Sequence, residues 1–372
     1  MLISNMEMIK FQSSPNPTLG VEIELQLIDK NTLDLKNISP KILSNVNKQF
    51  SNKIKHELFE SMIEINTDVC SNVAEVSNDI KQTLNYLEEI LNKYNTTINF
   101  SSLHPFAKGK NQTITNDNRY KRIMKDLQIV GKRFITQGLH VHVGIDNCEN
   151  VIKVNNALRI YLPLLLALST SSPFYEGEDT GLYSYRTKIF ESLPLAGLPD
   201  YLDNWNHFIN LTHNLIKAGI IHSVKDLWWE VRPHPGFGTV EIRICDIPTN
   251  FEEIIAIVAI IQALVVKIKN SDSYPDTHIQ ILESNKWQAV RYGLEGAFID
   301  PVSLKQSTIR KSIEDLCTLI EPTMISLKSR KYIKIIENIL IKGTGTTKKK
   351  SLFKVSGNFQ HMIKSLKEEF FK

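Results

Sequence analysis

The 372-residue chain lacks the short signatures of several common enzyme folds. It contains no GxxxxGK[ST] loop, no HExxH pair and no GxSxG turn. Their absence argues against a P-loop nucleotide-binding fold, a zinc protease of the HExxH type and a serine hydrolase. Gly343 and Gly345 form a GxG sequence, but the strand and helix patterns of a Rossmann turn do not flank it. If ATP binds, another arrangement must hold its phosphates.

Cysteines and long apolar runs are also scarce. The four cysteines are widely spaced and form no CxxC pair, so we expect free thiols in a cytoplasmic protein. The first ten residues include Glu7 and no long apolar core, which argues against a secretory signal. The most apolar run, residues 254–266, contains Gln262 and falls short of the ~20 residues that a membrane span needs. It predicts a buried helix and no membrane insertion.

The charge surplus is small. The net charge is +4, with 42% hydrophobic and 23% charged residues, which is the composition of a globular protein. Such a surplus suits an anionic small substrate, but it is too weak and too scattered to indicate a nucleic-acid partner. Because no convincing linker divides the chain, we predict a single catalytic domain over residues 1–372. A homo-oligomer, as a dimer or tetramer, is compatible with these features.

Alternating and helical patterns follow one another irregularly along the chain. Alternation of polar and apolar residues predicts strands at 19–28, 62–67, 139–145, 228–232 and 239–244. Helical periodicity predicts helices at 78–94, 151–169, 251–269, 309–320 and 328–341. Because strands and helices do not alternate regularly, a doubly wound parallel sheet is not indicated. We predict an α+β fold, with a mostly antiparallel sheet backed by helices.

Three segments carry turn signals. Residues 171–198 predict a long irregular connection of the kind that forms lids or binding surfaces. Residues 233–238 predict a bend between two strands, and residues 343–350 predict a flexible basic loop before a final short helix.

The strand at 19–28 carries two glutamates on one face. Glu22 and Glu24 alternate with apolar residues, so their side chains point to the same side. Two such positions are about 7 Å apart, whereas an Mg–O bond is only ~2.1 Å long. The pair therefore suits two neighbouring ions better than one shared ion, as in sites where two metals clamp a phosphoryl group. The alternative for this segment alone is a solvated acidic face.

Two further strands carry metal-binding side chains. Glu64 lies on the polar face of the strand at 62–67, and either Glu57 or Glu60 upstream could join it. Surface charge is the alternative for this cluster. His140 and His142 share a face of the strand at 139–145, and imidazole is a suitable ligand for a divalent ion. We expect one of the two histidines to bind metal and the other to form a structural hydrogen bond.

The last two strands pair carboxylates with guanidinium groups. Glu241 and Arg243 share one face of their strand, and Glu230 and Arg232 share a face of the strand before it. An exposed ladder of ion pairs is the alternative, and it would contribute little to stability. A metal-binding carboxylate beside a guanidinium is also what phosphoryl transfer requires, because the ion and the arginine share the charge of the phosphate.

The order of these strands resembles the glutamine-synthetase-like fold and, more closely, the type 2 glutamate–cysteine ligases of the carboxylate–amine ligase family. The resemblance covers nearly the whole chain, and its motifs are specific together although weak singly. They are 20–24 (GVEIE), 62–67 (MIEINT), 138–144 (GLHVHVG), 171–174 (SSPF), 179–181 (DTG), 184–186 (SYR), 231–239 (VRPHPGFGT), 291–294 (RYGL) and 343–345 (GTG). Lys348 to Lys350 depart from the family pattern, in which arginines are usual, so a C-terminal phosphate contact is in doubt.

The resemblance implies a curved antiparallel sheet whose concave face forms a funnel, where ATP and amino acids meet at Mg²⁺ ions, with Mn²⁺ as the alternative. It implies that the γ-carboxylate of glutamate attacks ATP and that an amine such as cysteine then displaces phosphate. The metal ligands that it implies are Glu22, His140 and Glu241 for one ion, and Glu24 and Glu64, with Glu57 as a further candidate, for the other.

The resemblance also assigns four residues to the substrates. Arg243 and Arg232 would neutralise the transferring phosphoryl group, and Tyr185 and Arg186 are candidates for substrate contact. Two other functions fit the same fold: a phosphotransferase of the guanidino-kinase type and a non-catalytic sensor of nucleotides or amino acids. A stable phosphorylated product would indicate the former. The number of carboxylates on facing strands argues against the sensor.

Overall fold

A computed structural model describes residues 9–272, 274 and 276–372. At its centre lies a seven-stranded sheet in the order β2-β3-β1-β5-β9-β8, with β4 paired to the far end of β1. Every pairing in this sheet is antiparallel. The strands are β1 (Leu19–Asp29), β2 (Ile54–His56), β3 (Met62–Asn66), β4 (Thr96–Asn99), β5 (Leu139–Gly144), β8 (Val231–His234) and β9 (Thr239–Ile242).

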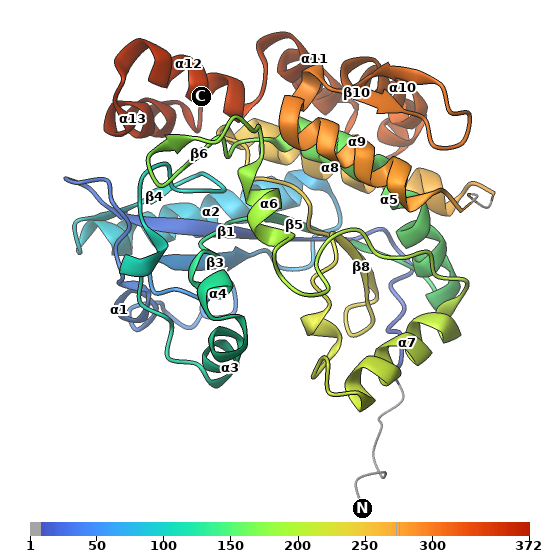
Figure 1. Ribbon diagram of the computed structural model, residues 1–372, viewed down its shortest axis with the longest axis horizontal. Coiled ribbons are helices and arrows are strands. Elements are labelled where there is room, and N and C mark those ends of the chain that lie inside the picture. Colours follow the sequence, from blue (N-terminus) through green and yellow to red (C-terminus); the bar gives the residue numbers. More distant parts are fainter. Residues whose placement is uncertain (1–8, 273, 275) are drawn as a thin grey trace, which may run out of the picture.

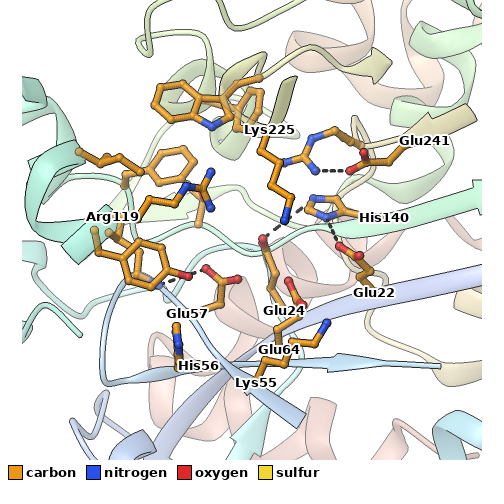
Figure 2. Close-up of a pocket in the computed structure, with 18 of the residues that line it drawn as sticks. Glu22, Glu24, Lys55, His56, Glu57, Glu64, Arg119, His140, Lys225 and Glu241 are labelled. Carbon is orange, nitrogen blue, oxygen red and sulfur yellow. Dashed lines mark hydrogen bonds and ion pairs between the residues drawn. The ribbon is translucent and has the colours of Figure 1, made fainter. Parts of the chain in front are cut away.

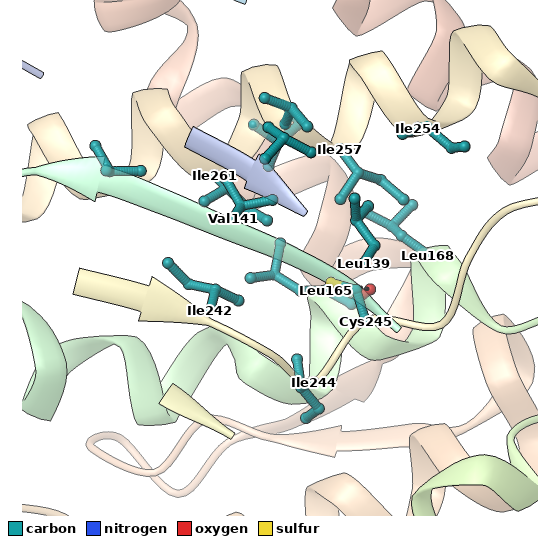
Figure 3. Close-up of a cluster of buried hydrophobic side chains, with 14 of the residues drawn as sticks. Leu139, Val141, Leu165, Leu168, Ile242, Ile244, Cys245, Ile254, Ile257 and Ile261 are labelled. Atoms are coloured by element: carbon teal, nitrogen blue, oxygen red, sulfur yellow. Dashed lines mark hydrogen bonds between the residues drawn. The ribbon is translucent and has the colours of Figure 1, made fainter. Parts of the chain in front are cut away.

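Helices cover one face of this sheet (Figure 1). Two long apolar helices, α5 (Cys148–Ser169) and α8 (Phe251–Lys269), lie against it, and Figure 3 shows Ile257 and Ile261 of α8 packed near Val141 of β5. The helices α2 (Val73–Asn92), α9 (Ile279–Tyr292), α10 (Ile309–Ser326) and α11 (Ile333–Lys342) extend this layer. This arrangement confirms the predicted α+β class.

The remaining elements are short or peripheral. The helices are α1 (Ser39–Leu43), α3 (Asn118–Leu127), α4 (Ile129–Lys132), α6 (Tyr185–Phe190), α7 (Trp205–Lys217), α12 (Gly345–Ser356) and α13 (Phe359–Glu369). Two small hairpins pair β6 (Phe174–Tyr175) with β7 (Glu178–Asp179), and β10 (Ala297–Ile299) with β11 (Gln306–Thr308). In Figure 1, α3 and α7 lie on the side of the sheet opposite to α5 and α8.

The sequence alternation in β1 sorts its side chains between the two faces of the sheet. Val21, Ile23 and Leu25 are at most 1% exposed and belong to the main apolar core, whereas Glu22 and Glu24 point to the other side. That core contains residues from Leu19 to Phe370. Burial of this face fixes the register, because a slip by one residue would turn both glutamates into the core.

The long apolar helix predicted at 251–269 is confirmed as α8. Of the helices that the structure describes, α5 is the one that is long and apolar enough to cross a membrane, and 89% of its apolar window is buried inside the protein. The core helices of soluble proteins also meet these two criteria.

Several predicted element boundaries were wrong. Helix α10 continues to Ser326 beyond the predicted end at 320, and α11 begins at Ile333 rather than at 328. Helix α2 begins at Val73, five residues before the predicted start, because the Asn72 side chain accepts hydrogen bonds from the backbone N–H of Ala74 and Glu75. The strand predicted at 228–232 is shifted to β8, which continues through Pro233 to His234.

Two predicted loops were also partly wrong. Residues 171–198 contain the short helix α6, and residues 345–356 form helix α12 in place of a flexible basic loop. Tertiary contacts explain α12: the Thr346 backbone N–H donates to the Thr170 carbonyl at 3.0 Å, and the Lys349 ammonium donates to the Ser171 carbonyl. Lys350 faces Asp179 and Lys348 faces Glu369, and none of the three lysines lines the cavity described below.

The turn between β8 and β9 requires glycine at position 238. Gly238 has φ +65°, a left-handed conformation that side chains rarely adopt, and an added Cβ would lie 1.5 Å from the Gln12 carbonyl oxygen. The Gln12 backbone N–H in turn donates to the Pro235 carbonyl at 2.9 Å. The N-terminal segment therefore holds this hairpin from outside and fixes the strands that carry Arg232 and Glu241.

Candidate active site

The face of the sheet that the helices leave open lines a cavity of about 700 Å³ (Figure 2). The floor of the cavity is formed by strands β1, β3, β5 and β9. These strands carry all the predicted metal ligands that lie within strands. One side wall comes from α3 and the other from residues 225–228, so the cavity is bounded by segments far apart in the sequence. Its floor brings Glu22, Glu24, Glu64, His140 and Glu241 into one space, as predicted from their strand faces.

Two sets of side chains on this floor could each hold a metal ion, and we call them the first and second carboxylate groups after their glutamates. The first consists of Glu22, His142 and Glu241. One ligand atom from each lies within 4.8 Å of the others. The His142 Nδ1 atom hydrogen-bonds the Thr239 hydroxyl at 2.9 Å, which leaves Nε2 facing Glu22 Oε1 at 3.5 Å and Glu241 Oε1 at 4.0 Å. Within the described residues this buried Nε2 atom has no hydrogen-bond partner. An imidazole held at one nitrogen and free at the other is the usual geometry of a metal-binding histidine.

The first group is electrically compensated by the protein itself. Burial acts to raise the pKa of Glu241, but the guanidinium groups of Arg232 and Arg243 hold it well below its ordinary value. Burial also acts to raise the pKa of Glu22, and contacts with the imidazoles of His140 and His142 lower it overall. Both carboxylates are therefore ionised without any added cation.

Glu24, Glu57 and Glu64 form the second carboxylate group, again with one oxygen from each within 4.8 Å of the others. Glu24 Oε2 accepts a hydrogen bond from the Gly138 N–H at 2.6 Å, and Glu64 Oε1 accepts one from the Asn66 amide at 2.7 Å. Glu57 follows β2 in a turn that directs its side chain into the cavity.

The question that the sequence left open between Glu57 and Glu60 has a geometric answer. Glu57 belongs to the second group, whereas Glu60 does not line the cavity in the part of the chain that the structure describes. The Glu60 backbone pairs instead with Ile38, Ser39 and Thr113. The residue directly after β2 therefore supplies the third carboxylate, whereas Glu60, later in the same turn, does not.

The second group lacks the compensation of the first. Burial raises the pKa of Glu24 to about 7, because the opposing charges of Arg186 and Arg243 do not offset the effect of burial together with that of the Glu64 charge. Burial also raises the pKa of Glu57, to which the charges of Glu24 and Glu64 add. Burial is also the main cause that raises the pKa of Glu64. Buried carboxylates whose pKa values are raised in this way are a set whose charge a divalent cation would neutralise.

The two histidines differ in which carboxylates they approach. The family resemblance implied His140 as the ligand beside Glu22 and Glu241, whereas in the structure His142 lies with these two glutamates. His140 lies between the two groups, with Nδ1 3.3 Å from Glu22 Oε2 and Nε2 4.0 Å from Glu24 Oε1. Burial lowers the pKa of His140 to about 4, so its imidazole is neutral and able to face either ion.

The two arginines of the β8–β9 hairpin have different surroundings. Arg232 donates to both oxygens of Glu241 and to the carbonyls of Val224, Lys225 and Leu227. Its guanidinium is committed to holding this wall of the cavity, which argues for a positioning role rather than the predicted phosphoryl contact. Arg243 pairs with Glu241 through Nη1 alone, and among the described residues its buried Nε has no partner. Arg243 is the better placed of the two for a substrate oxyanion.

Arg186 and Tyr185 also differ. Arg186 is 3% exposed and lines the cavity, with its guanidinium against the backbone carbonyls of Arg243 and Ile244. An added Cβ at Gly138 would lie 2.3 Å from Arg186 Nη2, so glycine is needed there for this close approach. Tyr185 is not among the described residues that line the cavity, and its ring lies 5.1 Å from that of Tyr175.

Several residues of the cavity walls escaped the sequence prediction. They are Lys55, His56, Arg119, Tyr120, Lys225, Trp228, His234 and Phe237. Arg119 of α3 lies 3.5 Å from Asp226, so an ion pair links the two opposite walls. Arg119 and Tyr120 lie on the polar helix α3, three others lie on the short strands β2 and β8, and the rest lie in turns and loops. No long alternation marks the inward face in any of these segments. The neighbouring aromatic residues in 228–237 were the one available signal.

The donor atoms of both groups fit divalent cations. Carboxylate oxygens are the ligands that Mg²⁺ and Mn²⁺ prefer, and the second group offers only such oxygens. The first group adds one imidazole nitrogen, which Mn²⁺ accepts readily and Mg²⁺ less so. The free Nε2 atom of His142 and the raised pKa values of the second group both indicate places that a cation would fill.

Comparison with known proteins gives a consistent result. Residues 18–369 match the sequence profile of the glutamate–cysteine ligase family 2. A protein of Gloeobacter violaceus named "Putative glutamate--cysteine ligase 2" is 38% identical, with 96% of this chain and 98% of that protein aligned. A protein of the same name from Solibacter usitatus is 34% identical, with 95% and 94% aligned.

A solved structure shares the fold. The crystal structure of a glutamate–cysteine ligase from Francisella tularensis in complex with AMP superposes with a TM-score of 0.73 at 16% identity, covering 96% of this chain and 89% of the other. At that identity the likeness concerns the fold alone. The family match and the two relatives confirm the resemblance found in the sequence. The chain belongs to the glutamate–cysteine ligase family 2 and is an ATP-dependent ligase.

Proposed function

We propose that the protein joins the γ-carboxylate of L-glutamate to the amine of L-cysteine, or of a related amine, with hydrolysis of ATP to ADP and phosphate. Family membership supports a ligase of this type. The observation that carries the proposal is the pair of carboxylate groups in one cavity, to each of which β1 contributes one glutamate. Two cations held side by side suit the transfer of a phosphoryl group between two anions.

The reaction has two steps. An oxygen of the glutamate γ-carboxylate attacks the γ-phosphorus of ATP, the bond to the β-phosphate oxygen breaks, and an acyl phosphate and ADP form. The nitrogen of the acceptor amine then attacks the acyl carbon, the bond from carbon to the phosphate oxygen breaks, and phosphate leaves with that electron pair. The attacking amine nitrogen loses one proton to the solvent and keeps the other as the N–H of the amide product.

The cavity residues would perform distinct parts of this reaction. Glu22, His142 and Glu241 would hold one Mg²⁺, and Glu24, Glu57 and Glu64 the other, with His140 between them. When bound, the cations would offset the negative charge on the phosphoryl oxygens.

The basic residues would bind the substrate oxygens. The guanidinium groups of Arg243 and Arg186 lie at the cavity floor, where the oxygens of phosphate or carboxylate can accept their hydrogen bonds. Arg232 would position the wall at residues 224–227. Tyr185, which we predicted to contact substrate, would act only from outside the described cavity lining.

The test is release of ADP by the purified protein with Mg²⁺, ATP, glutamate and a panel of amines. We expect ADP and phosphate in equal amounts, dependent on both amino acid and amine, with the amide identified by mass. Hydroxylamine in place of the amine should trap the acyl phosphate as a hydroxamate. Glu24→Gln should reduce the rate by at least about 100-fold, since direct ligands matter more than outer partners.

The outcomes separate this function from its alternatives. A stable phosphorylated product without amide would indicate a phosphotransferase, and nucleotide binding without any ADP release would indicate a sensor. The identity of the amine follows from the panel. A hydrophobic pocket discriminates substrates that differ by one methylene by only about 1–3 kcal/mol, so close analogues of cysteine should be compared by kcat/KM.

A further inference from the structure

A buried aspartate behind the cavity gathers several of the sequence motifs that the proposed chemistry does not use. Asp246 follows β9 and is 0% exposed. Its Oδ2 atom accepts hydrogen bonds from the Ser171 N–H at 2.9 Å and the Ser172 hydroxyl at 2.7 Å, and its Oδ1 atom accepts one from the Ser184 hydroxyl at 2.9 Å. The Arg186 Nη1 atom lies 3.9 Å from Oδ1. One carboxylate thus contacts both ends of the segment that carries Arg186.

Two hydroxyl groups connect this carboxylate to the backbone of Arg186. Ser172 donates to Asp246 and accepts a hydrogen bond from the Arg186 N–H at 3.2 Å. Ser184 donates to Asp246 and is the N-cap of α6, where its oxygen accepts from the Thr187 N–H. Because Arg186 is in the first turn of α6, both connections fix the point from which its side chain projects.

The guanidinium of Arg186 reaches the cavity through a narrow gap. It donates to the carbonyls of Ile244 at 3.0 Å and Arg243 at 3.2 Å, and Gly138 leaves room for it on the other side. Its charge also acts on Glu24, whose pKa it lowers against the effect of burial. A small shift of α6 would withdraw this positive charge from the second carboxylate group.

We propose that Asp246 is a positioning residue that holds Arg186 at the second carboxylate group through the hydroxyls of Ser172 and Ser184. Asp246 does not line the cavity in the described structure and touches no reacting atom, so it acts through Arg186. The catalytic side of this inference rests on the proposed function, because Arg186 must bind a substrate oxygen for its position to matter.

The test combines Asp246→Asn, Arg186→Met and the double variant in the ADP-release assay. Asn has the shape of Asp but lacks its charge and loses an acceptor. We expect Asp246→Asn to lower kcat about 10–100-fold, as is typical when the partner of an active-site group is removed, with a smaller change in the KM for ATP. The double variant should be no slower than Arg186→Met, because residues that act through one another are not additive.

Two further variants guard against a general loss of structure. Ser172→Ala keeps the charge and removes one connection, so it should fold and show a smaller loss in kcat than Asp246→Asn. Asp79→Asn is the matched control: Asp79 is 11% exposed and accepts hydrogen bonds from Lys53 and the Asp68 N–H, away from the cavity. It should leave kcat unchanged.

A crystal structure of Asp246→Asn provides a readout independent of activity. We expect the Arg186 guanidinium to leave its place beside Gly138. An unmoved Arg186, or a double variant whose loss is the product of the two single losses, would overturn the inference and leave the proposed function standing. Full activity of Arg186→Met would contradict the proposed role of Arg186 and with it the catalytic side of the inference. Absence of ADP release in the unmodified protein would contradict the proposed function, and the crystal structure would still decide the position of Arg186.

Discussion

The two carboxylate groups in the cavity share the strand β1 but differ in what surrounds them. In the first, Glu22 and Glu241 face a histidine and two arginines, and their pKa values are lowered. In the second, burial raises the pKa values of Glu24, Glu57 and Glu64, and the nearby charges of Arg186, Arg243 and Lys55 do not offset this effect. The protein itself compensates the charge of the first group, whereas protons or cations would complete the compensation of the second. The two groups should therefore respond in opposite ways to substitution, metal and pH.

The largest difference is expected from removing one charge in the first group. Glu241→Gln leaves Arg232 and Arg243 buried without their partner, which should reduce the free energy of unfolding by about 3–5 kcal/mol. Denaturant unfolding of the metal-free protein measures it. Glu57→Gln is the matched change in the second group. This substitution removes the repulsion of Glu57 by Glu24 and Glu64, so it should not lower the free energy of unfolding. Equal losses in both variants would show that the two groups are not different in this respect.

The next effect is stabilisation by Mg²⁺. At a free concentration 100 times its Kd, Mg²⁺ should raise the free energy of unfolding by about 2.7 kcal/mol. Because the second group is the less compensated, Glu57→Gln should remove most of this gain. Thermal unfolding with Mg²⁺ or with chelator measures the shift. A full Mg²⁺ response in Glu57→Gln would place the principal ion elsewhere.

The pH dependence of stability should also separate the groups. The ordinary pKa of a glutamate is 4.5, whereas folding raises the pKa of Glu24 to about 7, so the folded state binds more protons between these values. The stability that this group contributes is complete below pH 4.5 and is lost as the pH rises through 7. We expect the metal-free protein to lose about 1–2 kcal/mol between pH 5 and 8.

Glu57→Gln and Mg²⁺ are the controls for that loss. The substitution removes a buried carboxyl group whose own pKa is raised, so stability should change less with pH. Bound Mg²⁺ requires deprotonated ligands and should reverse the trend, because binding strengthens as the pH rises. Unfolding curves at pH 5, 6, 7 and 8 would decide, and an unchanged slope in Glu57→Gln would assign the effect to other buried acids.

The smallest effect is expected at Glu60. This glutamate precedes β3 in the same acidic stretch as Glu57 but lies outside the second group. Glu60→Gln should change the free energy of unfolding by less than about 0.5 kcal/mol and leave the Mg²⁺ response intact. A response like that of Glu57→Gln would mean that the turn after β2 can present either side chain.

The strand faces account for most of what the sequence predicted correctly. Alternation in β1, β3, β5 and β9 placed Glu22, Glu24, Glu64 and Glu241 on one face, and the structure brings them into one cavity. Alternation could not choose between His140 and His142, because both lie on that face and only the register with Thr239 and Glu241 distinguishes them.

The incorrect predictions concern segments whose conformation depends on distant residues. The sequence predicted a flexible loop at 343–350. In the structure Lys349 is buried, and its ammonium donates to the Ser101 hydroxyl at 2.5 Å and to the Ser171 carbonyl. The phosphate contact of Arg232, which the family resemblance implied, stays a prediction, and the bonds of Arg232 to the carbonyls of residues 224–227 are invisible in a pattern of local spacing.

Helix α12 has a consequence for how the protein is made. Both carboxylate groups are complete once residue 241 has been synthesised, but Thr344, Thr346 and Lys349, which hold the segment 170–184 from behind, come more than 160 residues after that segment. A chain emerging from the ribosome would therefore contain every candidate metal ligand long before the wall beside Arg186 is supported. We expect ion binding to be possible on the growing chain, and ligase turnover only after its last helices have docked.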